Sequence, residues 1–191
     1  VTGTTNTLVD AAGGSQKGYL YIKGHAEFAQ KGTLNITGQV KHGIRTGEYI
    51  TLKNATINVL SAVGDGINCE QFFQMTGGTI SIKGVGDDGI QCDIADSTTG
   101  STGEMADHED EDSGNVYIED GTLTVSVTAD AAKGVKSEGD MRISGGKVTI
   151  TTSGGGVWDS SKLKTKAASC LSADGAMTIS GGTLSLTSTG A

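Results

Sequence analysis

Acidic side chains recur at matched positions of one phrase that the chain contains twice. The phrase reads DGINCE at residues 65–70 and DGIQCD at residues 88–93, and a further aspartate, Asp87, precedes the second copy. Equivalent positions of the two copies are 23 residues apart. A period of this length with strand-like residues predicts a solenoid in which the two copies are neighbours. The matched pairs are Asp65/Asp88, Ile67/Ile90, Cys69/Cys92 and Glu70/Asp93.

Neighbouring copies would bring these carboxylates close together. Equivalent positions of adjacent strands lie about 4.8 Å apart, and two carboxylates about 5 Å apart repel by about 3 kcal/mol at an effective dielectric constant near 20. Oxygen ligands with no histidine or thiol in the outward register favour calcium over zinc or copper, so the phrase predicts a Ca2+ site. Asp and Asn are also common turn residues before Gly, which accounts for Asp65 and Asp88 taken singly but not for Asp87.

Basic residues align with the same phrase in a later copy. Lys133 aligns with Asp65 and Asp88, Lys136 with Asn68, and Arg142 lies one strand further along. A base beside calcium is what a polyuronate lyase needs, because calcium acidifies the uronate and the base removes its C5 proton. The alternative is that these cations only balance the neighbouring carboxylates.

Alternating apolar residues predict the strands that position the phrase. In six places along the chain, two apolar residues flank one polar residue, and each such triplet predicts a strand. A second strand and a two-residue turn, such as Gly77-Gly78, precede most of these pairs. With the strand that carries the acidic phrase, three short strands form a coil of about 23 residues, which is typical of an all-β, single-stranded parallel β-helix. The pairs are Leu34/Ile36, Ile57/Val59, Ile80/Ile82, Leu123/Val125, Val148/Ile150 and Leu184/Leu186.

One domain is predicted over residues 1–191, with a cap and irregular first coil at 1–31 and repeat coils at 32–191. Two long steps between coils predict loop insertions near 94–114 and 153–166. The first contains an acidic run at 109–112, which is interpreted as a solvated segment or as a further part of the cation site. The second contains Trp158, a candidate platform for a sugar ring or a loop anchor.

Composition narrows the class of partner. The chain has 31 glycines, no proline and 4% aromatic residues, which suits a slim interior. A net charge of −8 excludes nucleic acid and anionic membrane surfaces as natural partners. No apolar run is long enough to cross a bilayer, and three cysteines without a CxxC spacing indicate neither a disulfide framework nor a zinc site. We expect a monomer, exported after removal of a signal peptide to the periplasm, the cell surface or the medium.

The acidic phrases, together with the units MRISGG at 141–146 and MTISGG at 177–182, resemble a bacterial carbohydrate-binding β-helix family. That family is similar in shape to calcium-dependent polysaccharide lyases of the pectate type. The resemblance covers the chain from about Gly32 onward. It implies a right-handed helix, Ca2+ at the Asp-Gly-Ile corners and binding of acidic plant cell-wall polysaccharide. Later copies of the phrase lack the aspartate. The metal ligands that it implies are Asp65, Asp87, Asp88 and Asp93, together with Asn68 and Glu70.

Three functions are compatible with these observations. The leading hypothesis is non-catalytic, calcium-dependent binding of acidic, polygalacturonate-like polysaccharide. The second is a calcium-dependent polyuronate lyase that acts by β-elimination, and the third is a structural or adhesive surface protein that calcium only stabilises. The candidate residues for contact with the polysaccharide are Lys133, Lys136, Arg142 and Trp158.

Overall fold

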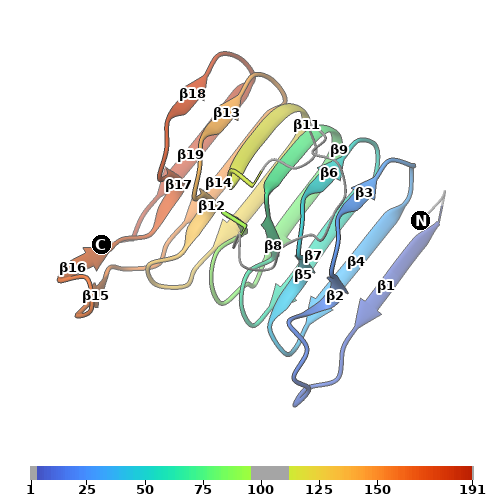
Figure 1. Cartoon of the computed structure of the whole chain (residues 1–191), viewed down its shortest axis with the longest axis horizontal. Coiled ribbons are helices and arrows are strands. Elements are labelled where there is room, and N and C mark those ends of the chain that lie inside the picture. The colour runs from blue at the N-terminus through green and yellow to red at the C-terminus, as the bar shows by residue number, and fades with distance from the viewer. Residues whose placement is uncertain (1–3, 96–111, 191) are drawn as a thin grey trace.

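A computed structural model describes residues 4–95 and 112–190. Within those ranges the regular secondary structure consists of β-strands alone. The all-β prediction is therefore confirmed. Figure 1 shows the strands stacked side by side from the N-terminal to the C-terminal end of the molecule. The described residues contain no helix with the length and hydropathy needed to span a membrane.

The larger sheet has eleven strands within the described residues. Its hydrogen-bonded path and side branches are formed by β1 (Thr5–Val9), β3 (Ala26–Phe28), β4 (Thr33–Gly38), β6 (Ile50–Leu52), β7 (Thr56–Ala62), β9 (Phe72–Lys83), β11 (Asn115–Val127), β13 (Met141–Ile143), β14 (Lys147–Thr152), β18 (Met177–Ile179) and β19 (Thr183–Ser188). All of their pairings are parallel, for example β4 with β7 and β11 with β14.

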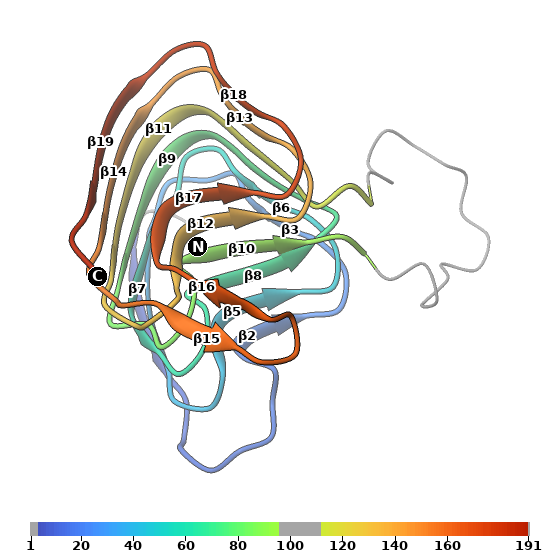
Figure 2. The same cartoon turned by 90° about the vertical axis from the view of Figure 1, so that its left-hand side faces the viewer.

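The smaller sheet carries the acidic phrase. Its strands, in spatial order, are β17 (Ser169–Ala173), β12 (Lys133–Ser137), β10 (Ile90–Asp93), β8 (Ile67–Glu70), β5 (His42–Thr46) and β2 (Gly18–Ile22). Figure 2 shows these six strands lying next to one another in this order. The pairing of Ile67 with Ile90 and of Glu70 with Asp93 is the register that the 23-residue period predicts.

Two strands of the larger sheet are longer than the alternation indicates. The predicted turn Gly77-Gly78 lies within β9, and the corresponding Asp120-Gly121 lies within β11. In both strands the second residue of the turn is a glycine with positive φ, 74° at Gly78 and 96° at Gly121, a left-handed conformation that glycine adopts without strain. The corner is thus formed without interrupting the strand.

A single apolar core takes side chains from both sheets. It consists mainly of Ile, Val and Leu, with Phe73 and Met75 among its largest fully buried side chains. Cys69 and Cys92 are buried neighbours in this core, and all three cysteines are free. The scarcity of aromatic residues matches this interior, because aliphatic side chains fill most of it.

The structure describes the second predicted insertion but little of the first. Most of the first, residues 96–111, lies outside the described residues, and with it most of the acidic run at 109–112. The second forms an antiparallel hairpin of β15 (Val157–Asp159) and β16 (Lys164–Lys166). In Figure 1 this hairpin projects from the C-terminal end of the stack. In the region predicted as a cap, β1, β2 and β3 pair with strands of the next repeat.

Candidate functional site

Each residue of the Asp-Gly-Ile phrase has a defined structural position. Ile67 and Ile90 fill the core and are fully buried. Gly66 and Gly89 allow neighbouring backbones to approach, because a Cβ atom at Gly66 would lie 2.7 Å from the carbonyl oxygen of Gly89. The aspartates stand at the start of the strand, where their carboxylates meet the next repeat.

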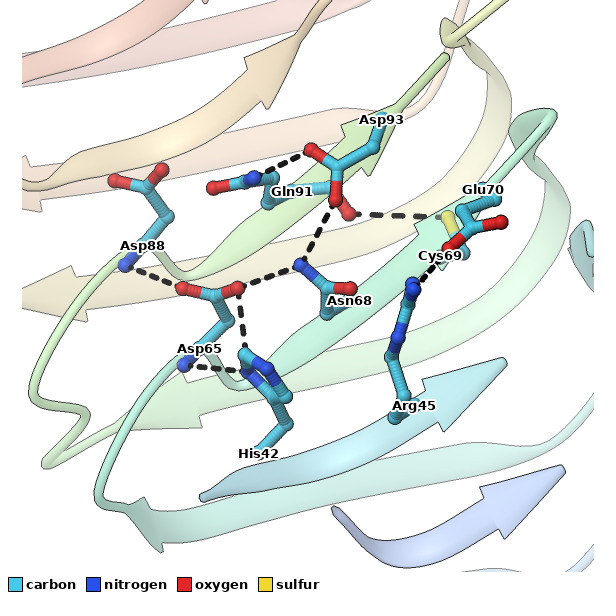
Figure 3. Close-up of polar contacts among 9 residues, drawn as sticks. All are labelled: His42, Arg45, Asp65, Asn68, Cys69, Glu70, Asp88, Gln91 and Asp93. Carbon is cyan, nitrogen blue, oxygen red and sulfur yellow. Dashed lines mark hydrogen bonds and ion pairs between the residues drawn. The ribbon is translucent and has the colours of Figure 1, made fainter. Parts of the chain in front are cut away.

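The aspartates belong to a ladder in which each side chain accepts the backbone amide of the next repeat. The amide of Asp65 donates to Nδ1 of His42 at 3.1 Å, and the amide of Asp88 donates to Oδ1 of Asp65 at 3.1 Å (Figure 3). The amide of Lys133 donates in turn to Oδ1 of Asp88 at 2.5 Å. Charge-assisted hydrogen bonds of this kind are stronger than neutral ones, so the ladder holds both carboxylates in place.

Three carboxylates converge at this corner. Asp65, Asp87 and Asp88 each offer an oxygen, and these oxygens lie within 4.8 Å of one another. Asp65 and Asp88 are buried, whereas Asp87 is exposed. We call this group the acidic corner.

The electrostatics of the acidic corner disfavour three negative charges. Burial, the largest cause, raises the pKa of Asp88 to about 7; the amide of Lys133 opposes this rise, and the charges of Asp87 and Asp65 add to it. Desolvation and then the charge of Asp65 also raise the pKa of Asp87. A cation bound between these carboxylates would offset both effects.

The other three predicted metal ligands lie three to five residues further along the chain than Asp65 or Asp88, and each has a protein partner. Asn68 donates from Nδ2 to Oδ2 of Asp65 at 2.8 Å and to Oδ2 of Asp93 at 3.4 Å. Gln91 donates to the other oxygen of Asp93. Glu70 forms an ion pair with Arg45, and both side chains are largely buried.

The donor set of the acidic corner fits calcium. It consists of hard carboxylate oxygens, and the exposed Asp87 has no hydrogen bond to another described residue. Calcium takes six to eight oxygen ligands and accepts irregular geometry. Three carboxylates would therefore leave positions for water or for oxygens of a bound ligand.

The acidic corner opens into a groove of about 990 Å³ between the smaller sheet and the hairpin. The side formed by the sheet carries acidic and basic side chains, and the side formed by the hairpin carries lysines and the tryptophan. Trp158 is 60% exposed, so its ring is available to a ligand. The residues that line the groove include Asp87, Asp88, Lys133, Lys136, Trp158, Asp159, Lys162, Lys164 and Lys166.

The predicted contact residues separate into two locations. Lys133, Lys136 and Trp158 line the groove together with Asp87 and Asp88 of the acidic corner. Arg142 does not line it: the guanidinium pairs with Asp140 at 3.4 Å and lies over the ring of Tyr117, 5.9 Å from its centroid. The ammonium of Lys133 donates to the carbonyls of Ala131, at 2.7 Å, and Ala167.

Sequence reasoning did not single out several residues of this region. His42 precedes Asp65 by one period, so the register alone points to it, and Arg45 has the same relation to Asn68. Lys162, Lys164 and Lys166 lie in an insertion, where no register with the repeat exists. Their only sequence signal is a cluster of positive charge in an acidic chain.

Comparison with known proteins identifies the family. A family model described as a carbohydrate-binding domain-containing protein matches residues 1–191. No significant match was found among curated proteins or among solved structures. The family supports carbohydrate binding. Since the match covers the whole sequence, the chain belongs to the family of carbohydrate-binding domain-containing proteins.

Proposed function

We propose that this chain binds acidic, polygalacturonate-like polysaccharide in the groove, without catalysis and with the help of calcium at the acidic corner. The scaffold of this proposal is a right-handed parallel β-helix. The parallel pairing of strands one repeat apart supports the helix, and crossovers between parallel strands of one sheet are right-handed in nearly all proteins. The protein would act as a monomer outside the cytoplasm, where cell-wall polysaccharide is found.

The observation that carries the proposal is the continuity of the groove. It connects Asp87 and Asp88 with Lys136 and with the exposed ring of Trp158. Flat aromatic rings pack against the apolar faces of sugars, while charged groups select for charged substituents. A groove with both features suits a sugar polymer that carries carboxylates.

Calcium, when bound, would bridge protein carboxylates and sugar carboxylates, which reconciles an acidic protein with an acidic ligand. The chain's own residues supply the conditions for that bridge. Backbone amides fix Asp65 and Asp88, so these side chains need little reorganisation on binding. Asp87 stays exposed beside them and faces the groove.

Calorimetric titration with oligogalacturonate tests the proposal. We expect binding in calcium, a large loss of affinity in a chelator, and a comparable loss in Asp87→Asn even when calcium is present. Asp120→Asn is the matched control, because Asp120 is an exposed aspartate of β11 that does not line the groove. Unchanged affinity in the chelator would contradict the calcium dependence, and absence of binding to any acidic oligomer would contradict the proposed ligand.

A lyase is the second candidate, because desolvation lowers the pKa of Lys133, a change that favours a catalytic base. Its ammonium, however, already donates to the carbonyl groups of Ala131, before β12, and of Ala167, directly after the hairpin. Incubation with polygalacturonate separates the two functions. A lyase generates an unsaturated product and growing ultraviolet absorbance, whereas the proposed binding function generates none.

A further inference from the structure

The hairpin β15–β16 has a charge opposite to that of the rest of the protein. Residues 157–166 contain three lysines and one aspartate, a net charge of +2 in a chain whose net charge is −8. The hairpin forms one wall of the groove, and the acidic corner lies on the sheet side. The groove therefore has one wall that is basic and one that carries the carboxylate cluster.

The single aspartate of the hairpin interacts with other residues of the hairpin. Asp159 pairs with Lys166 at 2.8 Å and accepts hydrogen bonds from the hydroxyl of Ser161 at 2.6 Å and from the amide of Lys162 at 3.2 Å. The bonds from Lys166 and then Ser161 hold the pKa of Asp159 below its usual range. Asp159 thus stays ionised and organises the turn, and it neutralises only Lys166.

The hairpin is also tied to the sheet at its base. The ammonium of Lys133 donates to the carbonyl of Ala167, directly after β16, while the amide of Lys133 donates to Asp88. One residue therefore connects the acidic corner with the start of the opposite wall. This link keeps the two walls at a defined separation near the corner.

Two lysines of the hairpin, Lys162 and Lys164, have no ionic partner among the described residues. Both side chains are exposed and line the groove. Lys136 on the sheet side interacts electrostatically with Asp87 and Asp88. If the hairpin lysines only balanced the acidic corner, ion pairs between the two walls would be expected, and none joins Lys162 or Lys164 to it.

We propose that Lys162 and Lys164, with Lys136 opposite and Trp158 beside them, form a metal-independent subsite for carboxylate groups of the polysaccharide. This inference rests on the proposed function of the groove. A polymer with a carboxylate on every ring presents some of these groups to each wall. Those that face the acidic corner need calcium, whereas those that face the hairpin meet ammonium groups directly.

The double substitution Lys162→Gln/Lys164→Gln tests the subsite. Both side chains are exposed, so the variant should fold and melt as the wild type does. Lys83→Gln/Lys147→Gln is the matched control, since it removes the same two charges from exposed positions of β9 and β14 outside the groove. Affinities for oligogalacturonate and for its methyl-esterified, uncharged form are measured by calorimetry, in calcium and in a chelator, at two salt concentrations.

We expect the wild type to retain weak, salt-sensitive binding of the acidic oligomer in the chelator. The double variant should bind the acidic oligomer about tenfold more weakly in both conditions, because each surface ion pair contributes a factor of a few. Its affinity should also depend less on salt. The control variant and binding of the esterified oligomer should be unchanged.

The outcomes separate this inference from the proposed function. Equal affinity of the double variant and the control overturns the subsite, even if the chelator abolishes binding and so supports the calcium corner. A tenfold loss in the double variant combined with indifference to the chelator supports the subsite and overturns the calcium dependence. A wild type that binds no acidic oligomer overturns both.

Discussion

Replacing Asp88 by asparagine should stabilise the calcium-free protein at neutral and alkaline pH. Asparagine keeps an oxygen that accepts the amide of Lys133, so the ladder survives. It removes one of three negative charges that lie within 4.8 Å of one another. The substitution therefore separates the structural part of this side chain from its charge.

The sign and size of the effect follow from the pKa of Asp88, which is raised from 3.8 to about 7. Between these values the folded protein holds a proton that the unfolded chain has released, so the free energy of unfolding falls as pH rises. The stability that the protonated form contributes is fully present below pH 3.8 and is lost as pH rises through about 7. A rise of about three pKa units corresponds to on the order of 4 kcal/mol.

Urea unfolding in a chelator at pH 4 and pH 8 measures this difference. We expect similar stabilities for wild type and Asp88→Asn at pH 4, and a more stable variant at pH 8. Adding calcium at pH 8 should stabilise the wild type by mass action and the variant much less. A difference that is the same at both pH values, or a wild type that is more stable than the variant at pH 8 in the chelator, would refute the reasoning.

Two further predictions concern the scaffold. Gly89→Ala should lower the free energy of unfolding by about 3 kcal/mol, because the added Cβ would lie 2.5 Å from the carbonyl oxygen of Gly134 and from Val125. Gly24→Ala, with no atom closer than 3.5 Å, should change it by less than about 0.5 kcal/mol in the same urea titration. The buried thiols should react with a maleimide only after denaturation, and rapid labelling of the native protein would contradict the buried positions of Cys69, Cys92 and Cys170.

The repeat made the central part of the fold predictable. A period of 23 residues places Ile67 beside Ile90 and Cys69 beside Cys92, and the structure has this register. Period-two alternation decides which side chains enter the core, because a shift by one residue would expose every apolar side chain of the strand. The proximity of Asp65 and Asp88 follows from the same register.

Two features of the site were beyond this kind of prediction. The 23-residue period matched Glu70 and Asp93 as a carboxylate pair. In the structure, Glu70 forms an ion pair with Arg45 of the preceding repeat, and the side-chain amide of Gln91 donates a hydrogen bond to one oxygen of Asp93. The direction in which long polar side chains turn depends on such partners, not on the period. The hairpin leaves the register altogether, so its position over the groove is a property of local contacts such as that of Lys133 with Ala167.

The acidic phrase admitted two interpretations, turn formation and cation binding, and the hydrogen-bond ladder makes them compatible. Asp65 and Asp88 have a structural task, because each accepts the amide of the next repeat. The same bonds prevent the two carboxylates from moving apart, so the repulsion between them is a consequence of the fold. Asp87 is exposed and accepts no backbone amide from residues 4–95 or 112–190, yet it lies within the same cluster. A structural role accounts for the first two residues and leaves Asp87 unexplained, so binding that is lost in Asp87→Asn without loss of stability would assign the corner to a ligand.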